Sequence, residues 1–166
     1  YTFAGWYSNS ALTTAYTFSK MPAEDLTLYA KWTANSYTIK FNANGGAGTM
    51  SNLSMSYDSA KTLTANAFTK QGYTFVGWNT KTDGTGISYE NNQSVKNLTT
   101  TSSASITLYA IWMANTYMIT YDANGGIGTM VNQAMKFDTK QGLLANSFVK
   151  TGYTFAGWNT KVDGSG

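Results

Sequence analysis

The strongest constraint on the fold is an internal repeat that covers most of the chain. The segment FNANGGAGTM at 41–50 returns as YDANGGIGTM at 121–130, and GYTFVGWNTK at 72–81 returns as GYTFAGWNTK at 152–161. LYAKWTANSY at 28–37 returns as LYAIWMANTY at 108–117, and YTFAGW at 1–6 is a further, truncated copy. Because the blocks recur in one order at a period of several tens of residues, the sequence predicts tandem supersecondary units.

The short segments TAN and MAN, which precede Ser36 and Thr116, are natural boundaries between units. We therefore expect one complete unit at 37–113, the C-terminal half of a preceding unit at 1–34 and the N-terminal part of a further unit at 117–166. Two interpretations of the partial units stay open. Either they belong to a longer array, or strands from neighbouring molecules complete them.

Alternation of apolar and polar residues predicts β-strands throughout each unit. Tyr37, Ile39 and Phe41 share one face of the first expected strand, and 117–121 repeats that pattern. Ile106, Leu108, Ala110 and Trp112 share a face in the LYA-W segment, as their counterparts do at 26–32. The segments 73–78, 53–58 and 133–138 add further expected strands.

A short helix is expected at 59–73 and again at 139–153. Leu63 and Ala67 in the first copy, and Leu144 and Phe148 in the second, lie at helix-compatible spacing. Gly72 and Gly152 follow as candidate C-caps. The residues alone thus predict an α+β, β-rich fold of small tandem units.

The segment between the GW strand and the LYA-W strand is eight residues longer in the second copy than in the first. Its extra part is polar and rich in turn residues, and length variation at one point of a repeat is typical of a surface loop. The loop at 82–103 is therefore the best candidate for a variable contact region.

Composition argues against several classes of function. Only 11% of the residues are charged, against about 25% in typical soluble domains. The chain has no Arg, His or Cys, and its Lys residues are scattered, so a nucleic-acid partner is not expected. No apolar stretch approaches the roughly 20 residues that span a bilayer. The absence of Cys excludes a disulfide framework.

Catalysis and cofactor binding find little support in the residues. Without imidazole or thiol, general acid–base and nucleophilic chemistry have few candidate groups, and the eight acids form no paired motif, so no enzyme activity and no catalytic residue are expected. DGTG at 83–86 and DGSG at 163–166 each offer one carboxylate, fewer than a calcium loop needs. We interpret both as Asp-initiated turns, and expect no metal or cofactor.

Five tryptophans recur at fixed positions, as core residues or, less favoured, as a sugar-binding platform. Tyr29 and Tyr109 lie on the opposite strand face from the Trp residues and are the candidate contact residues. The tryptophans are Trp6, Trp32, Trp78, Trp112 and Trp158.

The ordered combination of NANGG, GYTF-GW and LYA-W resembles the Listeria–Bacteroides repeat, also called the internalin B-repeat domain, across essentially the whole chain. The resemblance implies a small β-grasp-like fold with a mixed sheet around a short helix, standing in tandem in secreted and cell-surface bacterial proteins. It implies an extracellular, non-catalytic structural module, such as a stalk or spacer. A related hypothesis, suggested by the partial units at the two ends, is an adhesion-related filament subunit that polymerises by strand complementation.

The expected partners are neighbouring repeats or copies of the same chain. The alternative function is binding of a surface polysaccharide or host protein through the exposed Tyr residues and the loop at 82–103.

Overall fold

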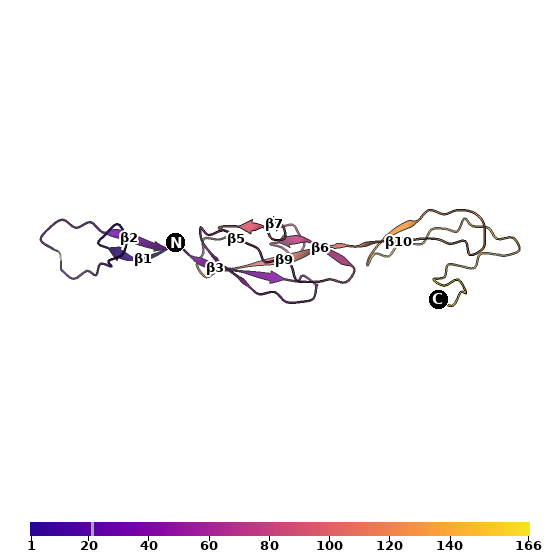
Figure 1. Ribbon diagram of the computed structural model, residues 1–166, viewed down its shortest axis with the longest axis horizontal. Coiled ribbons are helices and arrows are strands. Elements are labelled where there is room, and N and C mark those ends of the chain that lie inside the picture. Colours follow the sequence, from indigo (N-terminus) through magenta and orange to yellow (C-terminus); the bar gives the residue numbers. More distant parts are fainter. Residues whose placement is uncertain (21) are drawn as a thin grey trace. The chain divides into compact units, whose positions relative to one another are not determined.

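β-strands make up all the regular structure that the computed structural model describes, which covers residues 1–20 and 22–166 and contains no helix in those ranges. The described chain divides into two compact units, Tyr1–Gln71 with Phe75–Trp112, and Gly72–Thr74 with Met113–Gly166. The strands, drawn in Figure 1, are β1 (Thr2–Tyr7), β2 (Tyr29–Thr33), β3 (Ser36–Asn42), β4 (Leu53–Ser56), β5 (Lys61–Thr62), β6 (Tyr73–Asn79), β7 (Ser88–Tyr89), β8 (Ser94–Val95), β9 (Ser105–Ala114), β10 (Thr116–Ile119) and β11 (Gln133–Lys136).

A five-stranded sheet with the order β4-β3-β9-β6-β7 organises the complete repeat (Figure 1). β3 pairs with β4 in antiparallel fashion and with β9 in parallel, with Ile39 opposite Ile106 and Phe41 opposite Leu108. The last long strand of the repeat therefore lies beside its first strand. Parallel neighbours need a crossover connection, and residues 43–104 supply it.

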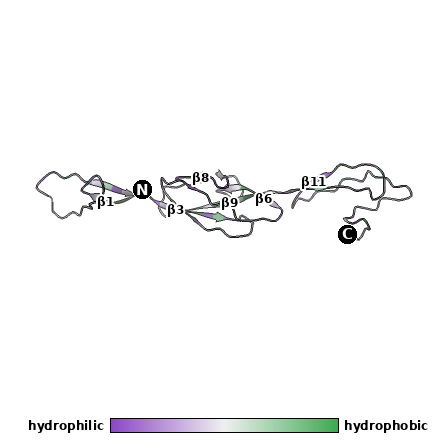
Figure 2. Ribbon diagram, in the orientation of Figure 1, coloured by the Kyte–Doolittle hydropathy of each residue, from purple (hydrophilic) through white to green (hydrophobic). Residues whose placement is uncertain are grey.

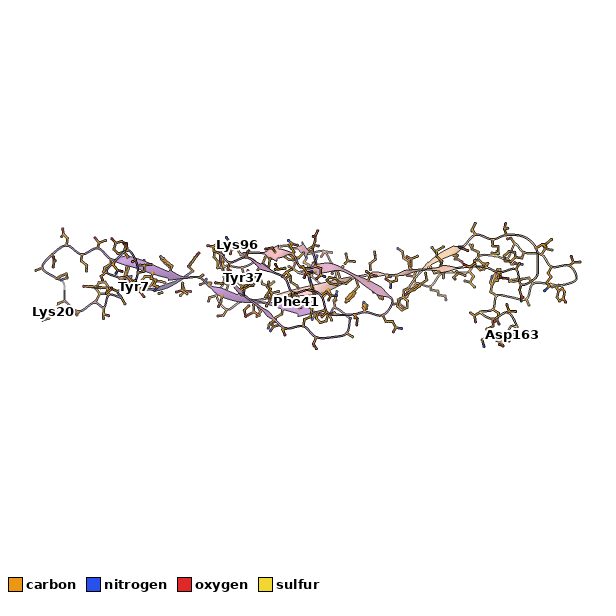
Figure 3. The ribbon with its side chains drawn as sticks, in the orientation of Figure 1. Tyr7, Lys20, Tyr37, Phe41, Lys96 and Asp163 are labelled. Carbon is orange, nitrogen blue, oxygen red and sulfur yellow. The ribbon has the colours of Figure 1, made fainter. Side chains whose placement is uncertain are left out.

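The predicted alternation of faces is confirmed in the complete repeat. Tyr37, Ile39, Leu108 and Ala110 are buried, and green segments on β3 and near β6 mark hydrophobic residues in Figure 2. Figure 3 labels Tyr37 and Phe41, both from β3, and Phe41 packs partly buried against the core. The core is rich in aromatic rings, because Phe41, Phe68 and Phe75 all contact the indole of Trp78 at centroid distances of 4.8, 6.1 and 5.0 Å.

The helices predicted at 59–73 and 139–153 are absent, so the chain is all-β, and the α+β, β-grasp-like class is wrong. In the complete repeat this segment forms its hydrogen bonds with distant segments instead of along itself. β5 pairs with β8, and the N–H of Leu63 donates to the carbonyl of Gln93. Ala47 and Thr69 exchange two backbone hydrogen bonds. These pairings leave no i to i−4 ladder for a helix.

An asparagine explains part of this departure from the helical pattern. The side-chain oxygen of Asn66 accepts from the N–H of Phe68 at 3.0 Å, and its amide donates to the carbonyl of Phe68 at 3.0 Å. Asn146 makes the same pair of bonds with Phe148, at 2.9 and 3.0 Å. Asn side chains that bond neighbouring backbone compete with helix formation.

Two-stranded sheets account for the remaining expected strands. β1 pairs with β2 in antiparallel fashion, with a register shift between Phe3 and Gly5, and β10 pairs with β11. Residues 153–158 repeat the sequence of β6 but form no strand, and the described residues hold no β9-like strand beside them. The unit boundaries at 34 and 113 stay predictions.

Leu63 tests the extended, core-packed segment that replaces the expected helix. Leu63 is 1% exposed, whereas its repeat counterpart Leu143 is 50% exposed. We expect Leu63→Ala to lower the free energy of unfolding by about 2–5 kcal/mol, because it empties a filled core position. The matched Leu143→Ala should change it by less than about 0.5 kcal/mol. Urea denaturation followed by Trp fluorescence measures both, and equal losses contradict the structure.

Candidate functional site

The two candidate contact tyrosines differ in exposure. Tyr29 begins β2 and is 38% exposed, and Tyr109 is half-buried in β9 between the buried residues Leu108 and Ala110. Tyr109 lies opposite Asn42 in the parallel pair of β3 and β9. In β9, Tyr109 alternates with the buried Leu108 and Ala110, whereas β2 contains no buried residue and Tyr29 is less exposed than Trp32. The structure does not bring them together on one sheet, because β2 pairs with β1 alone among the described strands.

The tryptophans differ in burial, and the most buried one, Trp78, lies in the complete repeat, while Trp158 in the partial copy is half-buried. Trp78 is 1% exposed in the complete repeat, and its indole N–H has no hydrogen-bond partner. Trp112 is half-buried, and its indole N–H donates to the carbonyl of Ala43 at 2.8 Å. Trp6 and Trp32 are 40% and 58% exposed around Phe3. The expectation of a core role is met where β3 and β9 are both present, and no open aromatic cleft surrounds Trp78.

The DGTG segment is a turn, as the sequence predicts. The carboxylate of Asp83 accepts from the backbone N–H and the hydroxyl of Thr85, at 3.0 and 2.8 Å. These hydrogen bonds, the backbone one first, hold the pKa of Asp83 below its ordinary value. Asp163 accepts from the N–H of Ser165 at 2.9 Å in the same way. Each carboxylate is thus already used to close its own turn.

Asn79 organises the same loop, and the sequence reasoning missed it. Its side chain is fully buried, with the amide donating to Gly84, Gly86 and Ser88 and the oxygen accepting from Lys81 and Gly86. Asn159 repeats the bonds to Gly164, Gly166 and Lys161. The signal was present, since WNTK recurs unchanged in both copies.

The ANGG segment forms a turn after β3, and the side chain of its Asn44 bonds to two other segments of the repeat. Asn44 and Gly45 have positive φ, 48° and 81°, and the amide of Asn44 donates to the carbonyls of Thr82 and Ala110 at 2.8 and 2.9 Å. A Cβ on Gly46 would lie 2.9 Å from the ring of Trp112. The repeated glycine phrase therefore serves packing and chain direction.

The loop at 82–103 is not a free surface segment. It contains β7 and β8, Val95 is 5% exposed, and Leu98 packs against the core. The N–H of Leu98 donates to the hydroxyl of Tyr37, and the side chain of Asn91 accepts from the N–H of Asn66. A variable contact region here is therefore built on residues that also complete the core.

Asp58 has more side-chain partners than Asp83 and Asp163. It forms a salt bridge with Lys96, labelled in Figure 3, at 3.3 Å, and no other salt bridge is found among the described residues. Its carboxylate accepts from the hydroxyl of Tyr1 at 2.5 Å and from the amide of Asn97 at 2.8 Å. The Tyr1 bond, then those from Asn97 and Lys96, hold the pKa of Asp58 at about 2, against 3.8 ordinarily. The same bond raises the pKa of Tyr1.

Two further features bear on possible functions, namely clusters of metal-ligating side chains and membrane-spanning helices. In residues 1–20 and 22–166, no three His, Cys, Asp or Glu side chains gather in a way that would hold a metal ion. The same ranges contain no helix with the length and hydrophobicity needed to cross a membrane.

The family model of the Listeria-Bacteroides repeat domain matches residues 1–31, 37–111 and 117–166. A protein of Evansella cellulosilytica named "Putative membrane protein" is 34% identical over 100% of this chain and 24% of its own length. A "Putative Gly-rich membrane protein" of that organism is 30% identical over 95% of this chain and 19% of its own length. Internalin H of Listeria monocytogenes is 47% identical over 51% of this chain and 15% of its own length.

The chain belongs to the Listeria–Bacteroides repeat family, as its repeated motifs predict. It spans about a quarter or less of the length of these relatives. No solved structure matches it. The repeat is a module of surface proteins that is generally without catalytic activity.

Acid titration tests the Asp58 cluster. Because the folded pKa lies below the ordinary 3.8, the carboxylate stabilises the fold above about pH 3.8, and this contribution is lost as the pH falls through 3.8 towards 2. We expect the carboxyl carbon of Asp58 to titrate near pH 2 by NMR. Tyr1→Phe should raise that midpoint most, because the Tyr1 bond is the largest cause. A midpoint of 3.8 in the unsubstituted chain would contradict the cluster.

Proposed function

We propose that the chain is a non-catalytic structural module that spaces other parts of a bacterial cell-surface or secreted protein. The observation that carries this proposal is the use of the repeated polar residues. Asn44, Asn79 and Trp112 bond to backbone groups of their own repeat, and Asn124 and Asn159 repeat part of that pattern. The residues that define the repeat are thus occupied in holding its loops.

The mechanism is geometric. Each complete repeat buries its own aromatic core, so its shape does not depend on a ligand, and tandem repeats add length in similar steps. Two residues, Ala34 and Asn35, join β2 to β3, and Asn115 alone separates β9 from β10. Connections this short restrict the freedom of one repeat against the next, as a spacer requires.

The family and its relatives support the setting. Internalin H and the two Evansella proteins named as membrane proteins contain sequences related to this chain, which supports a setting at the cell surface. The absence of His and Cys from the sequence agrees with a role that needs no proton transfer or nucleophile. On this proposal, the module works outside the cell and is not an enzyme.

Removing one repeat from the parent protein on intact cells tests the spacer. Deletion of Asn35–Ala114 joins Ala34 directly to Asn115 and regenerates a TAN boundary. We expect an epitope tag beyond the repeats to move closer to the cell by one repeat length, as measured by super-resolution microscopy. Tyr29→Ala with Tyr109→Ala is the control and should leave the tag in place. An unchanged tag position after the deletion contradicts a spacer.

The alternative is a binding module for a surface polysaccharide or host protein. Its support is the exposure of Tyr29 and the exposed residues of the loop at 82–103. The Tyr29→Ala, Tyr109→Ala control distinguishes the two proposals. Loss of adhesion of those cells, with the tag position unchanged, favours binding over spacing.

Polymerisation by strand complementation is a finer proposal about the same module. In the complete repeat β9 lies between β3 and β6, but its sequence copy β2 pairs only with β1, and β10 pairs only with β11 among the described strands. One edge of β2 and one edge of β10 thus have unpaired backbone groups, which favour strand addition. β2 of one copy would pair with β10 of another as β9 pairs with β3.

Light scattering on the 166-residue chain tests this pairing. We expect the mean mass to rise with protein concentration, because every added copy offers both edges. A proline at Lys31, in the middle of β2, should lower that mass by weakening strand pairing. A mass that stays at that of one chain over the whole concentration range contradicts polymerisation.

A further inference from the structure

The same constellation of side chains occurs at both repeat boundaries. At the first boundary it consists of Tyr1 and Thr2 at the start of β1, the linker residue Asn35, and the corner Tyr57-Asp58 that follows β4. At the second boundary the corresponding residues are Tyr73, Thr74, Asn115, Phe137 and Asp138. In each case three segments that are far apart in the sequence meet, and the segments come from two successive repeats.

The linker asparagine bonds to both repeats. The side-chain oxygen of Asn35 accepts from the hydroxyl of Thr2 at 2.7 Å, and its backbone carbonyl accepts from the N–H of Tyr57 at 2.8 Å. Its amide also donates to the carbonyl of Thr100, at 2.7 Å. Asn35 therefore holds the preceding strand with one group and the following repeat with two others.

Asn115 repeats this arrangement. Its side-chain oxygen accepts from the hydroxyl of Thr74 at 2.6 Å, and its carbonyl accepts from the N–H of Phe137 at 2.8 Å. Its own N–H donates to the carbonyl of Gly72 at 2.9 Å. The recurrence at the second boundary shows that the arrangement is a property of the repeat.

The corner of the following repeat receives the aromatic ring of the preceding one. Tyr1 packs edge-on against Tyr57 at a centroid distance of 5.6 Å, and Tyr73 packs in the same way against Phe137, also at 5.6 Å. Each tyrosine hydroxyl donates to the next carboxylate, to Asp58 at 2.5 Å and to Asp138 at 3.3 Å.

Backbone geometry prepares this corner. Asp58 and Asp138 both have positive φ, 63° and 58°, which Asp tolerates better than most residues. A Cβ on Gly72 would lie 2.3 Å from the ring of Phe137, so the residue before the docking tyrosine has to be glycine for the ring to approach. The glycine of GYTF is thus explained by the boundary, where the sequence alone suggested a helix cap.

Core packing of a single repeat does not require these contacts. Tyr1 is 53% exposed and Asp58 is also exposed, and neither belongs to the buried cluster around Trp78. Their bonds connect residues 57 positions apart, in different repeats. The geometry therefore describes an interaction surface between repeats.

We propose that the aromatic–Asp corner and the linker asparagine of each repeat form a docking surface for the Tyr-Thr strand start of the preceding repeat. Its partner is a neighbouring repeat of the same chain. This inference rests on the proposed spacer function and specifies how successive repeats are fixed. At the first boundary the dock is reinforced, because Asn97 and Lys96 also hold Asp58.

The absence of Cys from the chain allows a direct test with spin labels. Ser10→Cys and Thr64→Cys place exposed labels on the two sides of the first boundary, within one compact unit. Pulsed electron paramagnetic resonance on the 166-residue chain should give one narrow distance distribution. Asn35→Ala combined with Asp58→Ala should broaden it and remove the single maximum. The matched control, Asn52→Ala with Asp25→Ala, changes an exposed Asn and an exposed Asp outside the dock and should leave it narrow.

Near-ultraviolet circular dichroism of the Trp78 core reports whether the double variant still folds. If that signal is lost, Tyr1→Phe and Thr2→Val, which each delete one group, replace it and should broaden the distribution without a change in the core signal. A distribution that stays narrow in all of these variants, or is already broad in the labelled chain without any substitution in the dock, overturns the dock. The result is independent of the tag measurement on cells, so the dock and the spacer function fail separately.

Discussion

The parallel pairing of β3 with β9 is the interaction on which the rest of the repeat depends. It joins the first strand of the repeat to its last long strand, and β9 then lies between β3 and β6. Leu108 and Ala110 are inaccessible to solvent there, as is Ile39, and Trp78 is 1% exposed in the same core. In the two-stranded sheet of β1 and β2, the copies of β6 and β9, no β3-like strand pairs with β2 among the described residues. Trp6 and Trp32 there are 40% and 58% exposed.

The strands were predictable because their signal is local. Alternation at 37–41 and 106–112 reports directly which side chains face the core, and the structure buries Tyr37 and Leu108 accordingly. The segment at 59–73 shows where this reasoning fails. Leu63 and Phe68 belong to the buried core, next to backbone pairings with Gln93 and with Ala47 that the local pattern does not contain. The bond from Asn66 to Phe68 then favours a turn over a helix. A short helix and an extended segment that is buried at two positions can have the same spacing of apolar residues. Which of the two forms depends on the segments that pack against it.

In the candidate site, too, residues with local partners were predictable and residues with more distant partners were not. Asp83 was predictable as a turn residue because its partner Thr85 lies two positions away. The buried role of Asn79 and the boundary role of Asn35 involve partners that the pattern does not indicate, although both residues recur in the repeat. The length and polarity of the loop at 82–103 predict a surface segment, but Val95 contributes to the core. Variation in loop length therefore does not by itself identify a segment that is free for binding.

The low fraction of charged residues affects how the chain holds its loops and repeat boundaries. With 11% charged residues, the chain cannot fix its loops and boundaries through ion pairs, and the described residues contain a single salt bridge. Neutral hydrogen bonds from asparagine, threonine and tyrosine take that role, and they are less sensitive to ionic strength than exposed charge pairs. The carboxylates of Asp58, Asp83, Asp138 and Asp163 also accept such bonds from uncharged donors, and of these acids only Asp58 has a salt bridge, with Lys96, among the described residues. A spacer of the kind proposed has to keep its shape as the ionic strength changes, which such bonds do better than surface ion pairs, so the composition and the proposed spacer role have one explanation.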